Sequence, residues 1–124
     1  TLILSPYFID YESEKIGNFV DRFRYEFNCE PNDYTFRAYD LTLYFSIAIK
    51  RYGIRFFDHL NEIKDIDLLQ SNYAIESVNA WGGFENRGLK MINYSPDFLI
   101  KSQKFEPIIK AHQNIDISKQ TINQ

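Results

Sequence analysis

The residues that could do chemistry are few in this chain, and their spacing fits no catalytic or metal-binding motif. The two histidines, His59 and His112, do not form a ligand pair such as H-x-x-x-H. The single cysteine, Cys29, has no histidine near it in the sequence that could activate a thiolate. We therefore expect structural or solvent-facing histidines, a buried or loop thiol, no metal site, no cofactor and no enzymatic activity.

Two carboxylates, Asp65 and Asp67, lie two residues apart in a polar stretch. Paired carboxylates could serve acid–base catalysis, but aspartate is also a common turn residue because its side chain bonds to nearby backbone. We interpret this pair as turn chemistry.

The string Trp81-Gly82-Gly83-Phe84 is the most unusual local pattern. Aromatic rings on a loop tip are suited to stacking on a ligand or a partner, so Trp81 and Phe84 form a possible contact tip. The alternative is that the glycines make the turn and the rings cover the end of a sheet.

Asp40 follows Tyr39 in a segment that is otherwise apolar and helical in pattern. If this carboxylate is buried, it must be paired, cap a neighbouring element or face a cleft. The alternative is an aspartate that points outward into solvent.

The first half of the chain predicts three helices after a short strand. Residues 2–9 favour a strand broken by Pro6, with Asp10 and Ser13 as candidate helix caps. A helix from Glu14 has one apolar face, made by Ile16, Phe19, Val20, Phe23 and Phe27.

Residues 28–32 break that helix, and Asp33 can cap a second helix that runs to about Tyr52 and ends at Gly53. The apolar positions of the second helix surround much of its circumference, so we expect it to be covered on more than one side: Phe36, Tyr39, Leu41, Leu43, Tyr44, Phe45, Ile47 and Ala48. A shorter third helix is predicted at about 55–63.

The second half predicts strands. Alternating patterns at 72–79 and 86–94 indicate a hairpin, with paired glycines at 82 and 83 supplying the positive φ angles of the reversal. Residues 98–101 could add a short strand. We divide the chain into a domain at 1–104 and a polar tail at 105–124.

Composition narrows the class of protein. The 124 residues fit one domain, and the formal net charge of −3 with no basic run makes nucleic acid an unexpected partner. No apolar run is long enough for a membrane span, so we expect no membrane insertion. Aromatic residues reach 17%, more than a small core easily buries, which predicts contact with another surface. The strand-like start at Thr1 suggests a cut through a longer protein or a processed start.

The order of these elements resembles the C-terminal part of type 1 periplasmic binding proteins, the leucine and amino-acid receptor superfamily. The resemblance is carried by Phe19-x-x-x-Phe23-x-x-x-Phe27, a break with proline, and Ala38-Tyr39-Asp40 on a long helix with Ala48 and Gly53 after it. The pattern Tyr73 to Tyr94, with Gly82-Gly83 and Asn86-Arg87-Gly88, is similar to the terminal strand pair of that fold. The chain is especially similar to bacterial envelope members of that superfamily that carry LysM-type peptidoglycan-binding segments, over about residues 2–102.

This resemblance implies a partial type 1 periplasmic-binding-like, Rossmann-like α/β fold, with helices in the first half followed by an antiparallel hairpin. It implies a periplasmic or cell-envelope location and non-catalytic binding of a small polar solute or cell-wall component, between two lobes joined by crossing strands. Tyr39 and Asp40 are the positions it places near the ligand cleft or the helix packing that supports it. A second hypothesis is a protein–protein interaction module, including a homodimer formed through exposed strand edges.

Overall fold

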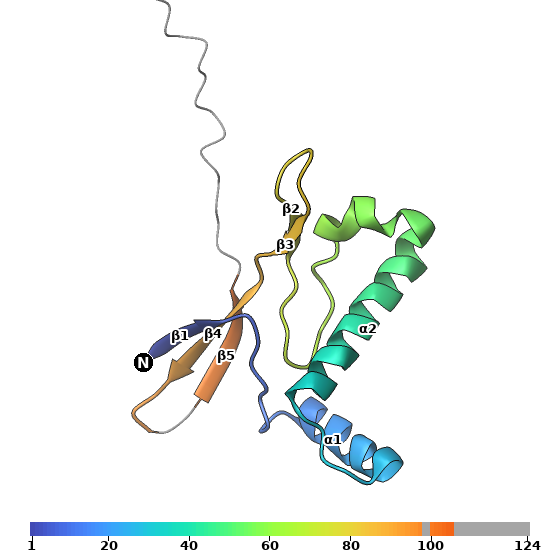
Figure 1. Cartoon of the computed structure of the whole chain (residues 1–124). Coiled ribbons are helices and arrows are strands. Elements are labelled where there is room, and N and C mark those ends of the chain that lie inside the picture. Colours follow the sequence, from blue (N-terminus) through green and yellow to red (C-terminus); the bar gives the residue numbers. More distant parts are fainter. Residues whose placement is uncertain (98–99, 106–124) are drawn as a thin grey trace, which may run out of the picture.

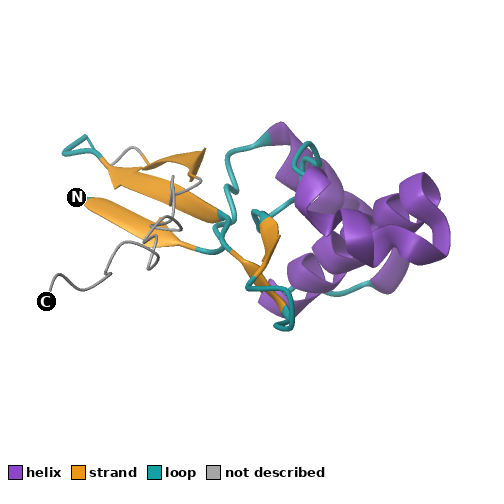
Figure 2. Cartoon of the chain, turned by 90° about the horizontal axis from the view of Figure 1, so that it is seen from above, coloured by secondary structure: helices purple, strands orange, loops and turns teal. Residues whose placement is uncertain are grey.

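The computed structural model describes residues 1–97 and 100–105, which form a helical part and a separate small sheet (Figure 1). Seen from above, the sheet and the helices lie at opposite ends, with a short hairpin between them (Figure 2). The described chain is therefore a mixed helix and sheet structure, broadly α/β. The tail predicted at 105–124 lies outside the described residues, apart from Phe105, and so does His112.

Two α-helices and a 3-10 helix make up the helical part. Helix α1 (Glu14–Phe27) begins after Ser13 and ends at Asn28, whose left-handed backbone directs its N–H to the carbonyl of Arg24. Helix α2 (Asp33–Tyr52) is capped by Asn32, one residue before the predicted cap, through reciprocal hydrogen bonds with Thr35. The third predicted helix is a 3-10 helix, η1 (Gly53–Glu62).

A three-stranded antiparallel sheet has the order β1-β4-β5. Its strands are β1 (Leu2–Ser5), β4 (Leu89–Tyr94) and β5 (Ile100–Phe105). Leu4 pairs with Met91, and Met91 pairs with Gln103. The strand β1 ends before Pro6, earlier than the predicted strand at 2–9, and β5 is longer than the short strand predicted near residue 100.

The predicted hairpin between 72–79 and 86–94 is wrong in its pairing. Strand β2 (Ile75–Ser77) pairs with the short β3 (Phe84–Asn86), and β4 belongs to the other sheet. The chain passes from the hairpin to the other sheet at Gly88, where an added Cβ atom would lie 2.3 Å from the Asn72 carbonyl oxygen. This close backbone approach redirects the chain, and only glycine permits it.

The hairpin tip also differs from the prediction. Among the described residues only Gly53 is a glycine with positive φ, so Gly82 and Gly83 do not supply it. Instead, the Asn79 side chain accepts a hydrogen bond from the Trp81 amide. A Cβ on Gly82 would lie 2.8 Å from that same Asn79 oxygen, so a larger residue there would displace the Asn79 side chain.

Buried side chains gather in the helical part in two adjoining clusters. One joins α1 to α2 through Ile16, Val20, Phe36 and Leu69, and the other joins α2 to η1 through Tyr44, Ala48, Leu60 and Ile63. The expectation that α2 is covered on more than one side is wrong for the described residues. A row on its next face, Leu41, Phe45 and Ile49, is 37–52% exposed. Within the described part of the chain, no helix combines the length and apolar character that a bilayer span requires.

Candidate functional site

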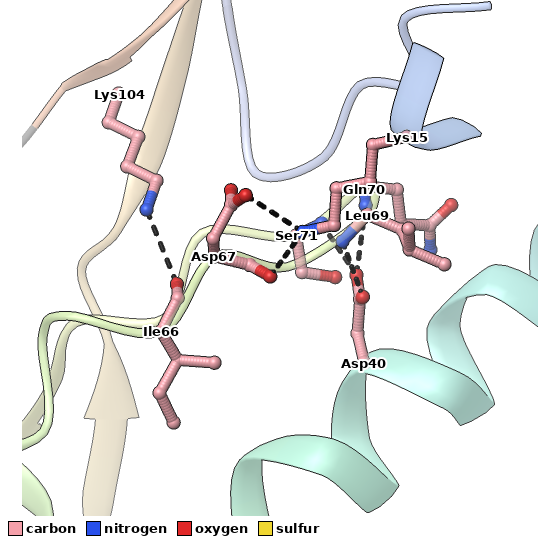
Figure 3. A network of polar contacts seen from close by, with 8 residues as sticks. All are labelled: Lys15, Asp40, Ile66, Asp67, Leu69, Gln70, Ser71 and Lys104. Carbon is pink, nitrogen blue, oxygen red and sulfur yellow. Dashed lines mark hydrogen bonds and ion pairs between the residues drawn. The ribbon is translucent and has the colours of Figure 1, made fainter. Parts of the chain in front are cut away.

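Asp40 is fully buried on α2 and anchors the loop that follows η1 (Figure 3). Its Oδ1 accepts a hydrogen bond from the Leu69 amide at 2.7 Å. Its Oδ2 accepts from the amides of Gln70 at 2.9 Å and Ser71 at 2.8 Å. The carboxylate therefore caps a neighbouring segment, which was one of the roles predicted for a buried aspartate. The alternative prediction, an aspartate that points into solvent, is wrong. A carboxylate engaged by three amides is a structural anchor.

The anchored loop lies between the two chain segments that connect the sheet to the helical part. On one side, the Phe8 amide donates to the Gln70 carbonyl at 2.8 Å, and Tyr7 forms a bridge with Ser71. On the other, the Asn72 side chain donates to the Leu89 carbonyl and the Asn86 side chain donates to the Asn72 carbonyl. We call residues 6–9, 66–74 and 86–89 the junction.

Three lysines hold the junction from the sheet and from α1. The Lys104 ammonium donates to the Ile66 carbonyl, and Lys15 contacts both the carbonyl and the carboxylate of Asp67 (Figure 3). Lys90, from β4, donates to the Phe8 carbonyl at 3.1 Å. Burial lowers the pKa of Lys90, against an opposing effect of the Asp40 charge. The hydrogen bond from Lys15 lowers the pKa of Asp67.

A groove with a volume of about 380 Å³ opens beside this anchor, along α1. Tyr39 and Leu69 form its side nearest the junction, so the structure brings the predicted residue Tyr39 into a concave surface while its neighbour Asp40 lies behind it. The lining residues from α1 are Lys15, Asn18, Phe19, Arg22, Phe23, Glu26 and Phe27. We call this surface the α1 groove.

The floor of the α1 groove is aromatic. Phe19, Phe23 and Phe27 follow one another at intervals of one helical turn, with ring centroids 6.1 and 4.6 Å apart. The Tyr39 ring meets Phe19 edge to face at 5.0 Å, which fixes the inner end of the floor. Phe27 is 65% exposed, so the face that the sequence predicts as apolar is only partly covered.

The wall of the α1 groove carries polar groups that the described chain leaves unused. Arg22 and Asn18 make no ion pair or side-chain hydrogen bond within residues 1–97 and 100–105, and the same holds for the Tyr39 hydroxyl. Lys15 differs, because it is paired with Asp67. The arrangement can offer hydrogen-bond donors above an apolar floor, with the Glu26 carboxylate as an acceptor at its outer end.

The two rings of the predicted contact tip, Trp81 and Phe84, have different surroundings, and a contact role for them stays a prediction. Trp81 is 99% exposed at the end of the hairpin β2–β3, so its ring does not cover the sheet. Phe84 is half exposed and lines a second cavity of about 510 Å³ between the hairpin and η1. Neither Trp81 nor Phe84 therefore lines the groove beside α1 that contains Tyr39.

The other candidate residues have structural surroundings. His59 stacks on Tyr52 and bonds to Glu62, and Cys29 is exposed after α1. Asp65 pairs with Arg51 and Asp67 pairs with Lys15. In the described ranges, no group of three or more His, Cys, Asp or Glu side chains is arranged to hold a metal ion.

Sequence reasoning missed the polar wall of the groove and the buried Gln70. The wall had a signal, because Lys15, Asn18, Arg22 and Glu26 recur at helical spacing beside the phenylalanine row. Gln70 had none: its side chain is fully buried and its amide has no partner among the described residues. In comparisons with known proteins, no family model, curated protein or solved structure matches this chain.

Proposed function

We propose that this chain is a non-catalytic part of a larger ligand-binding receptor of the type 1 periplasmic-binding kind, located in the bacterial envelope. Its ligand would be a small polar solute or a cell-wall component. Tyr39, in the α1 groove, would contact or border the ligand. Asp40 would fix the loop that carries Leu69, which lies beside Tyr39 at the inner end of the groove. In this proposal the protein binds its ligand without transforming it.

The junction is the observation that carries this proposal. Two connecting segments and the anchored loop between them are hydrogen-bonded side by side where the sheet meets the helical part. The resembled receptors have lobes joined by crossing strands, and the junction is compatible with such a connection. The Asp40 anchor supports a role in binding, because binding surfaces need a rigid frame.

Uncovered apolar surface supports the idea that further polypeptide packs on this chain. The α2 row Leu41, Phe45 and Ile49 is exposed, and so are the β1 side chains Leu2 and Leu4, at 59% and 51%. Solitary exposed apolar residues are ordinary, but rows on one helix face and one edge strand mark interaction surfaces.

Calorimetric titration tests the binding function. The chain, and the longer receptor in which the proposal places it, would be titrated with free L-amino acids and with soluble muropeptides. We expect saturable binding of one of these classes, tighter in the longer receptor, and weakened by Tyr39→Ala. Absence of binding to both proteins, across both classes, would count against the receptor.

Self-association is the second candidate, and the bare edge of β1 favours it. Residues 1–5 carry no charged side chain, whereas the opposite edge strand β5 carries Lys101 and Lys104, which discourage strand pairing. A homodimer through β1 would appear in sedimentation velocity as a concentration-dependent dimer. Replacing Ile3 with Lys should abolish that dimer, and a monomer at all concentrations would remove this candidate.

A further inference from the structure

The α1 groove combines two features that together select a class of ligand. Its floor is a row of phenylalanine rings, which favours an apolar group. Its wall carries Arg22, whose guanidinium has five donors and no partner in the described chain. An unused guanidinium above an aromatic floor is suited to a ligand that is apolar at one end and anionic at the other.

The charges along the wall indicate where an anion would lie. Lys15, at the inner end, is neutralised by Asp67, with an Nζ–Oδ2 distance of 2.9 Å. Arg22 is the next charged residue along the wall and makes no ion pair within the described residues, while Asn18, one turn before it, adds amide donors on the same side. The acidic residue Glu26 lies one turn further out. Of the two cations that line the groove, Arg22 is therefore the one that no carboxylate of the described residues pairs, and an anion would lie beside it.

We propose that the α1 groove binds a small amphipathic carboxylate. Its apolar body lies on Phe19 and Phe23, and its carboxylate receives two parallel hydrogen bonds from Arg22. This inference rests on the proposed binding function and names a ligand class for that same site. Arginine is the residue best shaped for such a forked contact with a carboxylate.

Other occupants fit the groove less well. A cationic amphipath could pair only with Glu26, at the outer end of the groove, and Arg22 would repel it from the inner end. A purely apolar ligand would remove water from Arg22 without supplying a partner. A partner helix is about 10 Å across with its side chains. The cavity of about 380 Å³ lies near the lower end of the range for small-molecule sites and better fits a short chain with one polar head.

The test uses two probes with the same eight-carbon body and opposite charges, octanoate and octylammonium. Each probe is titrated into the ¹⁵N-labelled full chain, at probe concentrations below those at which the probe forms micelles. The changes in amide chemical shift give the affinity and show which residues bind the probe. We expect octanoate to bind about tenfold more tightly than octylammonium, because only octanoate gains the charge-assisted contact. The shifts should centre on residues 15–27, 39 and 69.

Variants separate the contact with Arg22 from general effects of charge. Arg22→Gln should weaken octanoate binding about tenfold and leave octylammonium binding unchanged or slightly tighter. Lys50→Gln is the matched control, because it removes one positive charge from an exposed residue of α2 that does not line the groove. Phe23→Ala should weaken both probes, since it removes part of the shared floor.

Several results would overturn the inference. One is equal affinity of the chain for the two probes. Another is an equal loss of octanoate affinity in Arg22→Gln and Lys50→Gln. A third is a set of amide shifts confined to β1 and the exposed row of α2. If a solute of the calorimetric panel binds while octanoate does not, the ligand class is wrong and the receptor proposal stands. If no solute and no probe binds, both proposals fail.

Discussion

Tyr39 and Asp40 are neighbours on α2, yet they belong to regions with opposite properties. Asp40 faces the junction, where it is fully buried and its carboxylate is occupied by three amides. Tyr39 borders the α1 groove, is 41% exposed and has a hydroxyl without a partner in the described chain. One helical step of about 100° separates a residue that holds the fold from one that is available for contact.

The difference shows how polarity can be used in two ways in a small structure. At the junction, the Asp40 carboxylate is buried and bonded, so changing it should cost stability. In the groove, Arg22, Asn18 and the Tyr39 hydroxyl have no hydrogen-bond partner in the described chain, so changing them should cost binding and little stability. Substitutions on the two sides therefore provide a direct comparison.

The largest loss of stability is expected for Asp40→Asn. The amide retains one acceptor oxygen but turns an NH₂ group towards backbone amides that also donate, so buried donors lose their acceptor. We expect a loss of about 3 kcal/mol in the free energy of unfolding. Urea denaturation measures it, with Asp33→Asn on the exposed first turn of α2 as control, for which we expect less than about 1 kcal/mol. Equal effects of the two substitutions would contradict the anchor.

Gly88→Ala should be the next most damaging change. The added Cβ would meet the Asn72 carbonyl oxygen at 2.3 Å, so the junction segments that contain Asn72 and Gly88 must move apart. We expect a loss of about 2 kcal/mol. Gly83→Ala is the matched control, because nothing lies within 4 Å of its added Cβ, and thermal denaturation should barely distinguish it from the native chain. A tolerant Gly88 would show that the junction is loosely packed.

Gln70→Met should stabilise the chain. The substitution keeps the length of the side chain and removes a buried amide that has no partner in the described residues. We expect a gain of about 1 kcal/mol in urea denaturation. Gln103→Met, on the exposed surface of β5, should change little. Destabilisation by Gln70→Met would mean that the buried amide contributes to the native state.

Asp67 should give a smaller, pH-dependent effect. Lys15 lowers its pKa below the ordinary value of 3.8, so the pair stabilises the fold above that pH and the contribution is lost as pH falls through the lowered pKa. Because both side chains are substantially exposed, we expect less than about 1 kcal/mol. Asp67→Asn should be less stable than the native chain at about pH 6 and equal to it near pH 2. In a Lys15→Met background the difference at pH 6 should become smaller, and only the weaker effects of the Lys104 and Lys90 charges should remain.

Arg22→Gln should have the smallest effect on stability. Its guanidinium makes no ion pair or hydrogen bond within the described residues, so the unfolding free energy should stay within about 0.5 kcal/mol of the native value. The same urea experiment checks this. A loss as large as that of Gly88→Ala would place Arg22 among the residues that hold the fold, and the comparison with the junction would no longer hold.

The helices were predictable because their signals are local. Apolar spacing, the break at 28–32 and Gly53 gave α1 and α2 nearly to the residue. The strand pairing could not be predicted from local signals. It depends on the close approach of Gly88 to Asn72 and on hydrogen bonds of the Asn86 side chain, which join distant parts of the chain. Asp40 could be narrowed to a few roles, but its three amide partners lie about thirty residues away.

The central claim is that ligand binding takes place in the α1 groove, beside the loop that Asp40 anchors. The most direct measurement is the ¹H–¹⁵N spectrum of the full chain during titration with the L-amino acids and muropeptides of the calorimetric panel. At about 10 mM solute, enough to reveal a Kd near 1 mM, we predict the largest shifts at residues 15–27, 39 and 69. Shifts confined to other surfaces, or none from either class, would contradict the claim.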